Sequence, residues 1–350
     1  MKIERRDFFK GALAGAAGTL LVGGCGNDRS RTTCNRNIGD AHKVGVSSLA
    51  IDPSGTLLAS GGSDALVKLW RLPDGALQGT LAGHSQDVVS LAISPDGTRL
   101  ASGSSDSTVK LWSLPEGALL ATLAGHTLPI AGLAFSPDGF LLASGSADAT
   151  VKLWNVADGS LLATLVGHTL AITDVATSPD GTLLVSSSED QTLNLWSLPG
   201  GGLVSTIPIQ GGWVEALKFN PDGAQLITGG SNDGNAVVLW SMPTCVPAKT
   251  LKGHLGAVKA VAMTPDQSMV VSGGLDMTIR LWHAANSGSI EVVRDHADVV
   301  NALAITPDGK LLVSGSTDRS IRFWHLPGGS YAGSASDPAL PVQTVVSFTC

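Results

Sequence analysis

The chain has 350 residues, of which 43% are hydrophobic and 15% are charged, and its formal net charge is −7. This hydrophobic content excludes a disordered chain, and the negative charge argues against a nucleic-acid binder, which normally presents a basic surface. The 43 glycines indicate many turns and many short strands, and the four cysteines include no Cys-x-x-Cys pair that would suggest a zinc ribbon or c-type haem. The composition predicts an acidic, all-β protein.

Residues 1–24 have the composition of an export signal. A charged start that contains Arg5 and Arg6 precedes an apolar run that is too short to span a bilayer. The arginine pair and the Asp-Phe-Phe-Lys that follows resemble the twin-arginine export motif. Glu4 stands where that motif has Ser or Thr, and Phe9 stands where it has Leu. We therefore expect export to the bacterial cell envelope.

The apolar run ends in Val22-Gly23-Gly24-Cys25, which resembles a bacterial lipobox with Val in place of the preferred Leu. The resemblance implies lipid attachment to Cys25, which would be the chain's only contact with a membrane. A plain cleavable signal, in which Cys25 is incidental, remains the alternative. Residues 25–40 are polar and irregular, and we interpret them as a tether.

A unit of about 42 residues then repeats. The tryptophans that end successive units are 42, 42, 42, 44, 42 and 42 residues apart. They are Trp70, Trp112, Trp154, Trp196, Trp240, Trp282 and Trp324. One such unit cannot bury its own faces, so seven copies predict a stacked or closed array.

Each unit has the pattern of short strands separated by turns. In unit two we expect strands over 88–93, 99–102, 108–112 and 119–123. The turn Ser94-Pro95-Asp96-Gly97 has Pro to fix φ and Gly to supply a positive φ. Similar turns recur at Pro53, Pro137, Pro179, Pro221, Pro265 and Pro307. Turn chemistry explains one Asp per hairpin, so we expect no metal there.

Three dipeptides of unit two resemble the WD40 repeat family: Gly83-His84 at its start, Ser105-Asp106 in a turn and Leu111-Trp112 in a strand. The resemblance covers about residues 41–335. It implies an all-β fold, a seven-bladed WD40-type β-propeller with four antiparallel strands per blade, which we expect to be monomeric. The family's Asp after Trp is replaced by Arg71, Ser113, Asn155, Ser197, Ser241, His283 and His325.

Six of the eight histidines occupy one repeat position, each with Ser, Asp and Trp at fixed distances. The sets are His42, Ser60, Asp64, Trp70; His84, Ser102, Asp106, Trp112; His126, Ser144, Asp148, Trp154; His168, Ser186, Asp190, Trp196; His254, Ser272, Asp276, Trp282; and His296, Ser314, Asp318, Trp324. The resemblance implies a buried hydrogen-bond chain in each blade. A Ser-His-Asp trio also suggests a hydrolase, but six copies at a fixed period indicate architecture.

No histidine is left for a general base or a metal, because His283 and His325 both follow a unit Trp. The sequence also has no P-loop and no Gly-x-Ser-x-Gly motif. We therefore expect a non-catalytic interaction scaffold without a cofactor. A periplasmic enzyme that uses the channel, and a tethered structural protein without a specific ligand, are the alternatives.

Unit five departs from the others. It has Ile209-Gln210 in place of Gly-His, two extra turn residues, and Trp213 where other units have smaller side chains. These are Gly45, Asp87, Pro129, Ala171, Ala257 and Val299. The resemblance places this loop on the top face, beside the channel, where an exposed Trp is a typical interface anchor. Alternatively, Trp213 fills the space of the missing His.

The other candidate partner-binding positions on the top face are mixed in sign. They are Glu215, Lys259, Asn301, Asp87 and Glu189. A surface of this kind favours a protein or peptide partner over a polyanion such as a nucleic acid.

Unit seven needs a fourth strand from one end of the chain. Residues 342–348, in the tail 336–350, have the best β composition, so we expect that segment to close the blade. The alternatives are 330–334 and, with a still weaker β composition, 34–39. A Cys34–Cys350 bridge is conceivable if both ends meet there.

Overall fold

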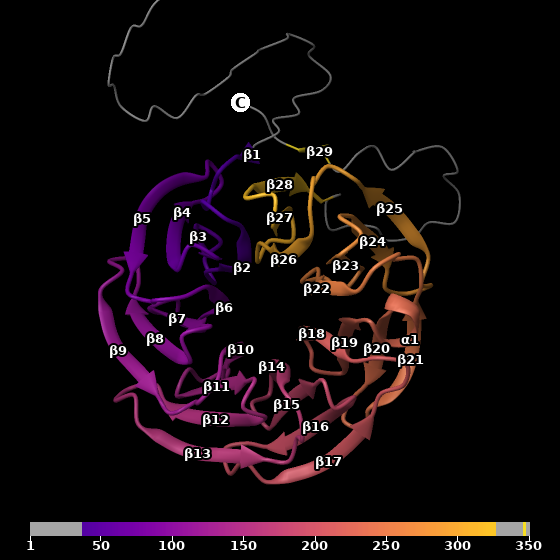
Figure 1. Ribbon diagram of the computed structural model, residues 1–350. Helices are drawn as coiled ribbons and strands as arrows, with labels where there is room; N and C mark the ends of the chain where they lie inside the picture. Colours follow the sequence, from indigo (N-terminus) through magenta and orange to yellow (C-terminus); the bar gives the residue numbers. More distant parts are fainter. Residues whose placement is uncertain (1–36, 327–345, 348–350) are drawn as a thin grey trace, which may run out of the picture.

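A computed structural model describes residues 37–326 and 346–347. The predicted export signal, Cys25 and the conceivable Cys34–Cys350 bridge lie outside these residues, as does the segment 330–334. The described chain forms seven antiparallel sheets arranged radially around an axis (Figure 1). This confirms the predicted seven-bladed β-propeller with four strands per blade. No helix in the described ranges is long and apolar enough to cross a membrane.

Blades one to three follow the chain without a break. They consist of β2 (Val46–Ile51), β3 (Leu57–Gly62), β4 (Leu66–Arg71) and β5 (Ala76–Ala82); β6 (Val88–Ile93), β7 (Arg99–Ser104), β8 (Thr108–Ser113) and β9 (Leu119–Ala124); and β10 (Ile130–Phe135), β11 (Leu141–Ser146), β12 (Thr150–Asn155) and β13 (Leu161–Val166). In each blade the first strand lines the centre and the fourth lies at the rim (Figure 1).

Blades four to six continue this order. They consist of β14 (Ile172–Thr177), β15 (Leu183–Ser188), β16 (Thr192–Ser197) and β17 (Leu203–Pro208); β18 (Val214–Phe219), β19 (Gln225–Gly230), β20 (Val237–Ser241) and β21 (Val246–Leu251); and β22 (Val258–Met263), β23 (Met269–Gly274), β24 (Ile279–His283) and β25 (Ser289–Val293). The extra residues of unit five form the short α1 (Asn232–Asn235) between β19 and β20.

Both ends of the chain close blade seven. Its strands β26 (Val300–Ile305), β27 (Leu311–Ser316) and β28 (Ile321–His325) are completed by β1 (Asn37–Ile38) and β29 (Val346–Ser347). β1 pairs with the first half of β28 and β29 with its second half. β composition favours the carboxyl-terminal segment and ranks 34–39 below it, but in the structure both ends pair with β28. An open edge is paired through backbone groups, which any non-proline residue carries.

The core lies between the blades. Each of the seven hydrophobic clusters joins strands of two neighbours, as Leu111, Ile130 and Trp154 do between blades two and three. Neighbouring sheets approach closely at Gly103, where a Cβ atom would stand 2.5 Å from Cγ2 of Ile130. Equivalent glycines are Gly61, Gly145, Gly229, Gly273 and Gly315. The ring closes where β26 contacts β2.

The Asp residues of the hairpins hold turns. The Asp96 carboxylate accepts a hydrogen bond from the Ser94 hydroxyl at 2.6 Å and one from the Thr98 N–H at 3.0 Å. Gly97 follows with a φ of 71°. Within the described ranges, no group of three or more His, Cys, Asp or Glu side chains is placed to hold a metal ion.

Candidate functional site

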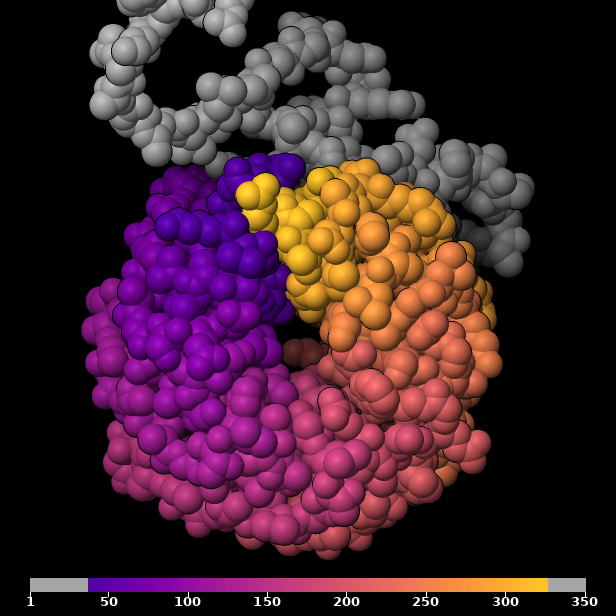
Figure 2. Space-filling view, in the orientation of Figure 1, coloured from indigo at the N-terminus to yellow at the C-terminus, as the bar shows by residue number. Residues whose placement is uncertain are grey.

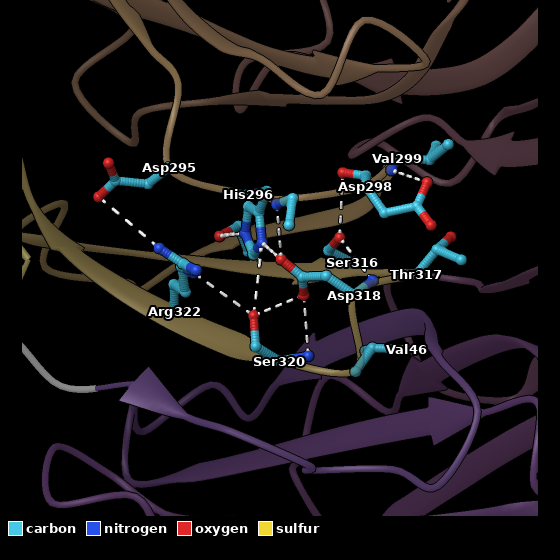
Figure 3. Close-up of polar contacts among 12 residues, drawn as sticks. Val46, Asp295, His296, Asp298, Val299, Ser316, Thr317, Asp318, Ser320 and Arg322 are labelled. Atoms are coloured by element: carbon cyan, nitrogen blue, oxygen red, sulfur yellow. Dashed lines mark hydrogen bonds and ion pairs between the residues drawn. The ribbon is translucent and has the colours of Figure 1, made fainter. Parts of the chain in front are cut away.

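Six blades contain the same buried chain of four side chains. In blade three, Trp154 Nε1–H donates to Ser144 Oγ at 2.8 Å, and Ser144 Oγ lies 2.8 Å from His126 Nε2. His126 Nδ1 lies 2.8 Å from Asp148 Oδ2. Figure 3 shows the His–Asp end of the corresponding group in blade seven, where His296 faces Asp318 and the Ser320 hydroxyl donates to the same carboxylate. In each of these six blades, the set links the loop that carries the histidine to the Trp within the blade.

The direction of these hydrogen bonds fixes the state of the histidine. Because Ser144 accepts from Trp154, its own hydroxyl is free to donate to His126 Nε2, which leaves the ring proton on Nδ1 to bond to Asp148. Burial lowers the pKa of His126 below its usual range, against the opposing effect of Asp148. The pKa values of His42 and His84 are lowered for the same reason. The imidazole is therefore neutral at pH 7.

The Asp of each set is held as a carboxylate. Burial raises the pKa of Asp106, but hydrogen bonds from Thr108, Ser85 N–H and His84 outweigh it and lower the pKa to about 2. The side chain of Asp106 is only 10% exposed. A neutral His beside a stable carboxylate resembles a catalytic pair, yet its Ser hydroxyl is fully buried against Trp and cannot reach a substrate. These sets stabilise the blades.

Blade five keeps the Trp contact without a histidine. Trp240 Nε1–H donates to Thr228 Oγ1 at 2.9 Å, while Gln210, at the histidine position, is exposed. Ile209 is 6% exposed and belongs to the hydrophobic cluster that contains Trp240. An apolar side chain thus packs in this region of the blade, and Trp213 does not belong to the cluster.

Trp213 lies on the top face, which we define as the face that carries the His-containing loops and the turns between second and third strands. Its side chain is 39% exposed. Its backbone is fixed, because its carbonyl accepts a hydrogen bond from Ser231 N–H at 3.1 Å. The indole is therefore presented from an ordered loop.

Blade six adds three apolar side chains that the sequence analysis missed. Leu255, Leu275 and Met277 are 81%, 44% and 45% exposed. They surround the Asp276 turn: Leu255 N–H donates to Asp276 at 2.9 Å, and the other two flank Asp276 in the chain. Comparing the residues beside each repeat Asp would have revealed them, since these neighbours are polar or small in most other units.

The remaining predicted partner residues divide into two groups. Lys259 forms an ion pair with Glu215, which joins the inner strands of blades five and six. Asn301 Nδ2 donates to the Val46 carbonyl at 2.9 Å and so joins blades seven and one. These three side chains hold neighbouring blades together. By contrast, the side chains of Asp87 and Glu189 are exposed, on blades two and four.

The inner strands enclose a central channel of about 980 Å³. Figure 2 shows its opening at the centre of the disc. Small and larger apolar residues line the wall, and its charged side chains, Asp174, Glu215, Lys218 and Lys259, all come from blades four to six. Burial raises the pKa of Asp174 to about 6, against the lowering effect of the Leu217 and Val175 N–H groups and of Lys218.

The fold and its repeated buried sets define a seven-bladed β-propeller. The WD40 family model, described as WD domain, G-beta repeat, matches seven segments of the chain. They are residues 33–71, 75–113, 117–155, 159–197, 201–241, 245–283 and 288–325. The chain therefore belongs to the WD40 repeat family, whose propellers typically act as interaction scaffolds and are generally not enzymes. A comparison with curated proteins found no match.

Proposed function

We propose that this propeller is a scaffold that binds a protein or peptide on its top face. The carrying observation is a set of four exposed apolar side chains on the top face of the neighbouring blades five and six, which we call the top-face patch: Trp213, Leu255, Leu275 and Met277, all 39–81% exposed. Large exposed apolar side chains that gather on one face mark interaction sites, and Trp is enriched among interface hot spots.

Packing of the fold does not account for Trp213. Four of the six equivalent positions hold Gly, Ala or Pro, among them Ala171 and Ala257 in the adjoining blades. The backbone hydrogen bond at this position is nevertheless the same, because the Ala257 carbonyl accepts from Leu275 N–H at 2.9 Å just as Trp213 accepts from Ser231. A large indole is thus unnecessary for the loop and available for a partner.

The test compares Trp213→Ala with the control Phe140→Ala. Phe140 is 71% exposed in the β10–β11 turn, away from the patch. Partners captured from envelope extract by the wild type are identified, and their Kd values are measured with each variant. We expect Trp213→Ala to weaken binding by about 2 kcal/mol or more. Phe140→Ala should bind as the wild type does.

Two results would contradict the proposal. One is equal binding of the same partners by the wild type and Trp213→Ala. The other is a large loss of stability in Trp213→Ala, which would make the indole part of the core. The unfolding free energy of each variant is therefore measured beside its Kd.

We also propose that the protein works in the bacterial cell envelope, exported through the Arg5-Arg6 pair and anchored by a lipid on Cys25. The support is the sequence of residues 1–25. In the double variant Arg5→Lys, Arg6→Lys we expect the protein to stay in the cytoplasm, as seen by cell fractionation. Cys25→Ala should release the exported protein from the membrane or leave its precursor uncleaved. Normal export of the arginine variant, or an unmodified Cys25 in a membrane-free mature protein, would contradict these assignments.

A further inference from the structure

One position of the channel wall is occupied differently in blade five than in every other blade. The fifth residue of each inner strand lines the channel. It is Lys218 in blade five and alanine in the other six blades, namely Ala50, Ala92, Ala134, Ala176, Ala262 and Ala304. Six repeats show that alanine satisfies the fold here, so packing between blades does not explain the lysine.

Lys218 lines the channel with an exposed side chain, and its charge lowers the pKa of the nearby Asp174. In the part of the chain that the structure describes, Lys218 forms no ion pair and no side-chain hydrogen bond. The nearby Asp174 has both carboxylate oxygens engaged: Oδ1 accepts from Val175 N–H and Oδ2 from Leu217 N–H, each at 2.8 Å. By contrast, Lys259, the channel's other lysine, is neutralised by Glu215.

The surrounding wall leaves room for a ligand. The six alanines at the level of Lys218 carry only a methyl group each, and the channel has a volume of about 980 Å³. A lysine ammonium is a compact charge with three donors, suited to an oxygen anion without demanding a planar partner. We propose that the channel binds an oxyanion at Lys218, the anionic group being a carboxylate, sulfate or phosphate. This site is separate from the proposed top-face patch.

The anion has two possible sources, a free small molecule or an acidic side chain of a bound peptide. Isothermal titration calorimetry at pH 7 and constant ionic strength uses sulfate as the free probe and acetyl-Gly-Glu-Gly-amide as the peptide probe. Acetyl-Gly-Gln-Gly-amide, which has the same length but no charge, is the control peptide. We expect at least one anionic probe to bind. Lys218→Ala should weaken the binding of that probe by about tenfold or more, because of the two lysines that line the channel it removes the one that forms no ion pair.

A matched control removes a lysine outside the channel. Lys252 is 63% exposed and pairs with Asp233 beside α1, so Lys252→Ala changes the net charge equally and should leave binding unchanged. Lys218→Arg should restore most of the affinity. Because Lys218→Ala installs the residue of the other six blades, we expect it to fold.

A second readout uses Asp174, the carboxyl group whose pKa Lys218 lowers. Burial raises the pKa of Asp174 to about 6. Of the strands packed against β14, which carries Asp174, β10, β11 and β15 have no titratable side chain, whereas β18 has Glu215 and Lys218. As the pH falls from 7 to 5, Asp174 loses its charge while sulfate keeps its own. If sulfate binds, its affinity should therefore rise.

The proposal is overturned if neither anionic probe binds. It is also overturned if the anionic probe or probes that bind have the same affinity for the wild type and for Lys218→Ala. It is also overturned if the glutamine peptide binds as tightly as the glutamate peptide and sulfate does not bind. Binding of sulfate alone would identify a free anion as the source, and binding of the glutamate peptide alone would identify a peptide. If the oxyanion proposal fails, the Trp213 experiment is unaffected, because that experiment concerns the top face and not the channel.

Discussion

Replacing His126 by Ala tests whether the buried sets stabilise the propeller. His126 is 8% exposed and Ser144 is fully buried. Without the imidazole, Ser144 still accepts from Trp154, but its own hydroxyl loses its acceptor, which costs about 1–3 kcal/mol. The space left by the ring adds about 1 kcal/mol. We expect a total loss of about 3 kcal/mol in unfolding free energy.

Asp148 adds little to this loss. It keeps hydrogen bonds from Thr127 N–H at 3.1 Å, from Thr150 N–H at 3.0 Å and from the Thr150 hydroxyl at 2.6 Å. The assay is urea denaturation at pH 7.5, followed by tryptophan fluorescence and circular dichroism, where agreement of the two probes justifies a two-state fit.

Blade five supplies the control. Gln210→Ala changes the equivalent position, where the side chain is exposed, and we expect a change within about 0.5 kcal/mol. A loss of less than about 0.5 kcal/mol in His126→Ala would refute the reasoning. The same holds if Gln210→Ala proves as destabilising as His126→Ala.

Three further predictions concern the ring. The stability of the wild type should fall from pH 7 to pH 5, because the lowered pKa values of His42, His84 and His126 let the unfolded chain bind protons first. The raised pKa of Asp174 acts in the opposite direction below about pH 6. A urea midpoint that stays constant or increases as the pH is lowered from 7 to 5 would mean that this one carboxyl group outweighs the three imidazoles. Gly103→Val places atoms against Ile130 and should cost about 2 kcal/mol in urea denaturation, whereas Gly39→Ala, with open space around it, should cost nothing measurable. Deleting residues 338–350 removes β29 from the edge of β28 and should lower the Tm by about 3 °C, and an unchanged melting curve would contradict a stabilising role for that strand.

The sequence alone determined the fold because each unit repeats the same pattern of strands, turns and spaced polar residues. The spacing of the tryptophans predicted seven blades, and the repeated Ser, His and Asp positions predicted which side chains need one another. The turn at Pro95 to Gly97 could be predicted because its conformation depends on neighbouring residues only. Such features are local or are copied in six or seven of the blades.

Only the tertiary structure decided the features that depend on one particular place in the ring. Asn301 and Val46 are 255 residues apart, and their hydrogen bond exists because the circle closes there. The closure itself combines β1 with β29, since backbone groups rather than side chains pair an open edge.

The candidate sites also depend on position in the ring. Trp213 was suggested by the sequence because it departs from the repeat, but Leu255, Leu275 and Met277 became part of a surface only when blades five and six stood side by side with those side chains exposed. Similarly, Lys218 stands out only in the assembled ring, where the equivalent residues of the other six blades line the same channel and are alanines. A repeat pattern fixes what every blade shares, whereas exposure and charge balance are sums over neighbours that are distant in the sequence.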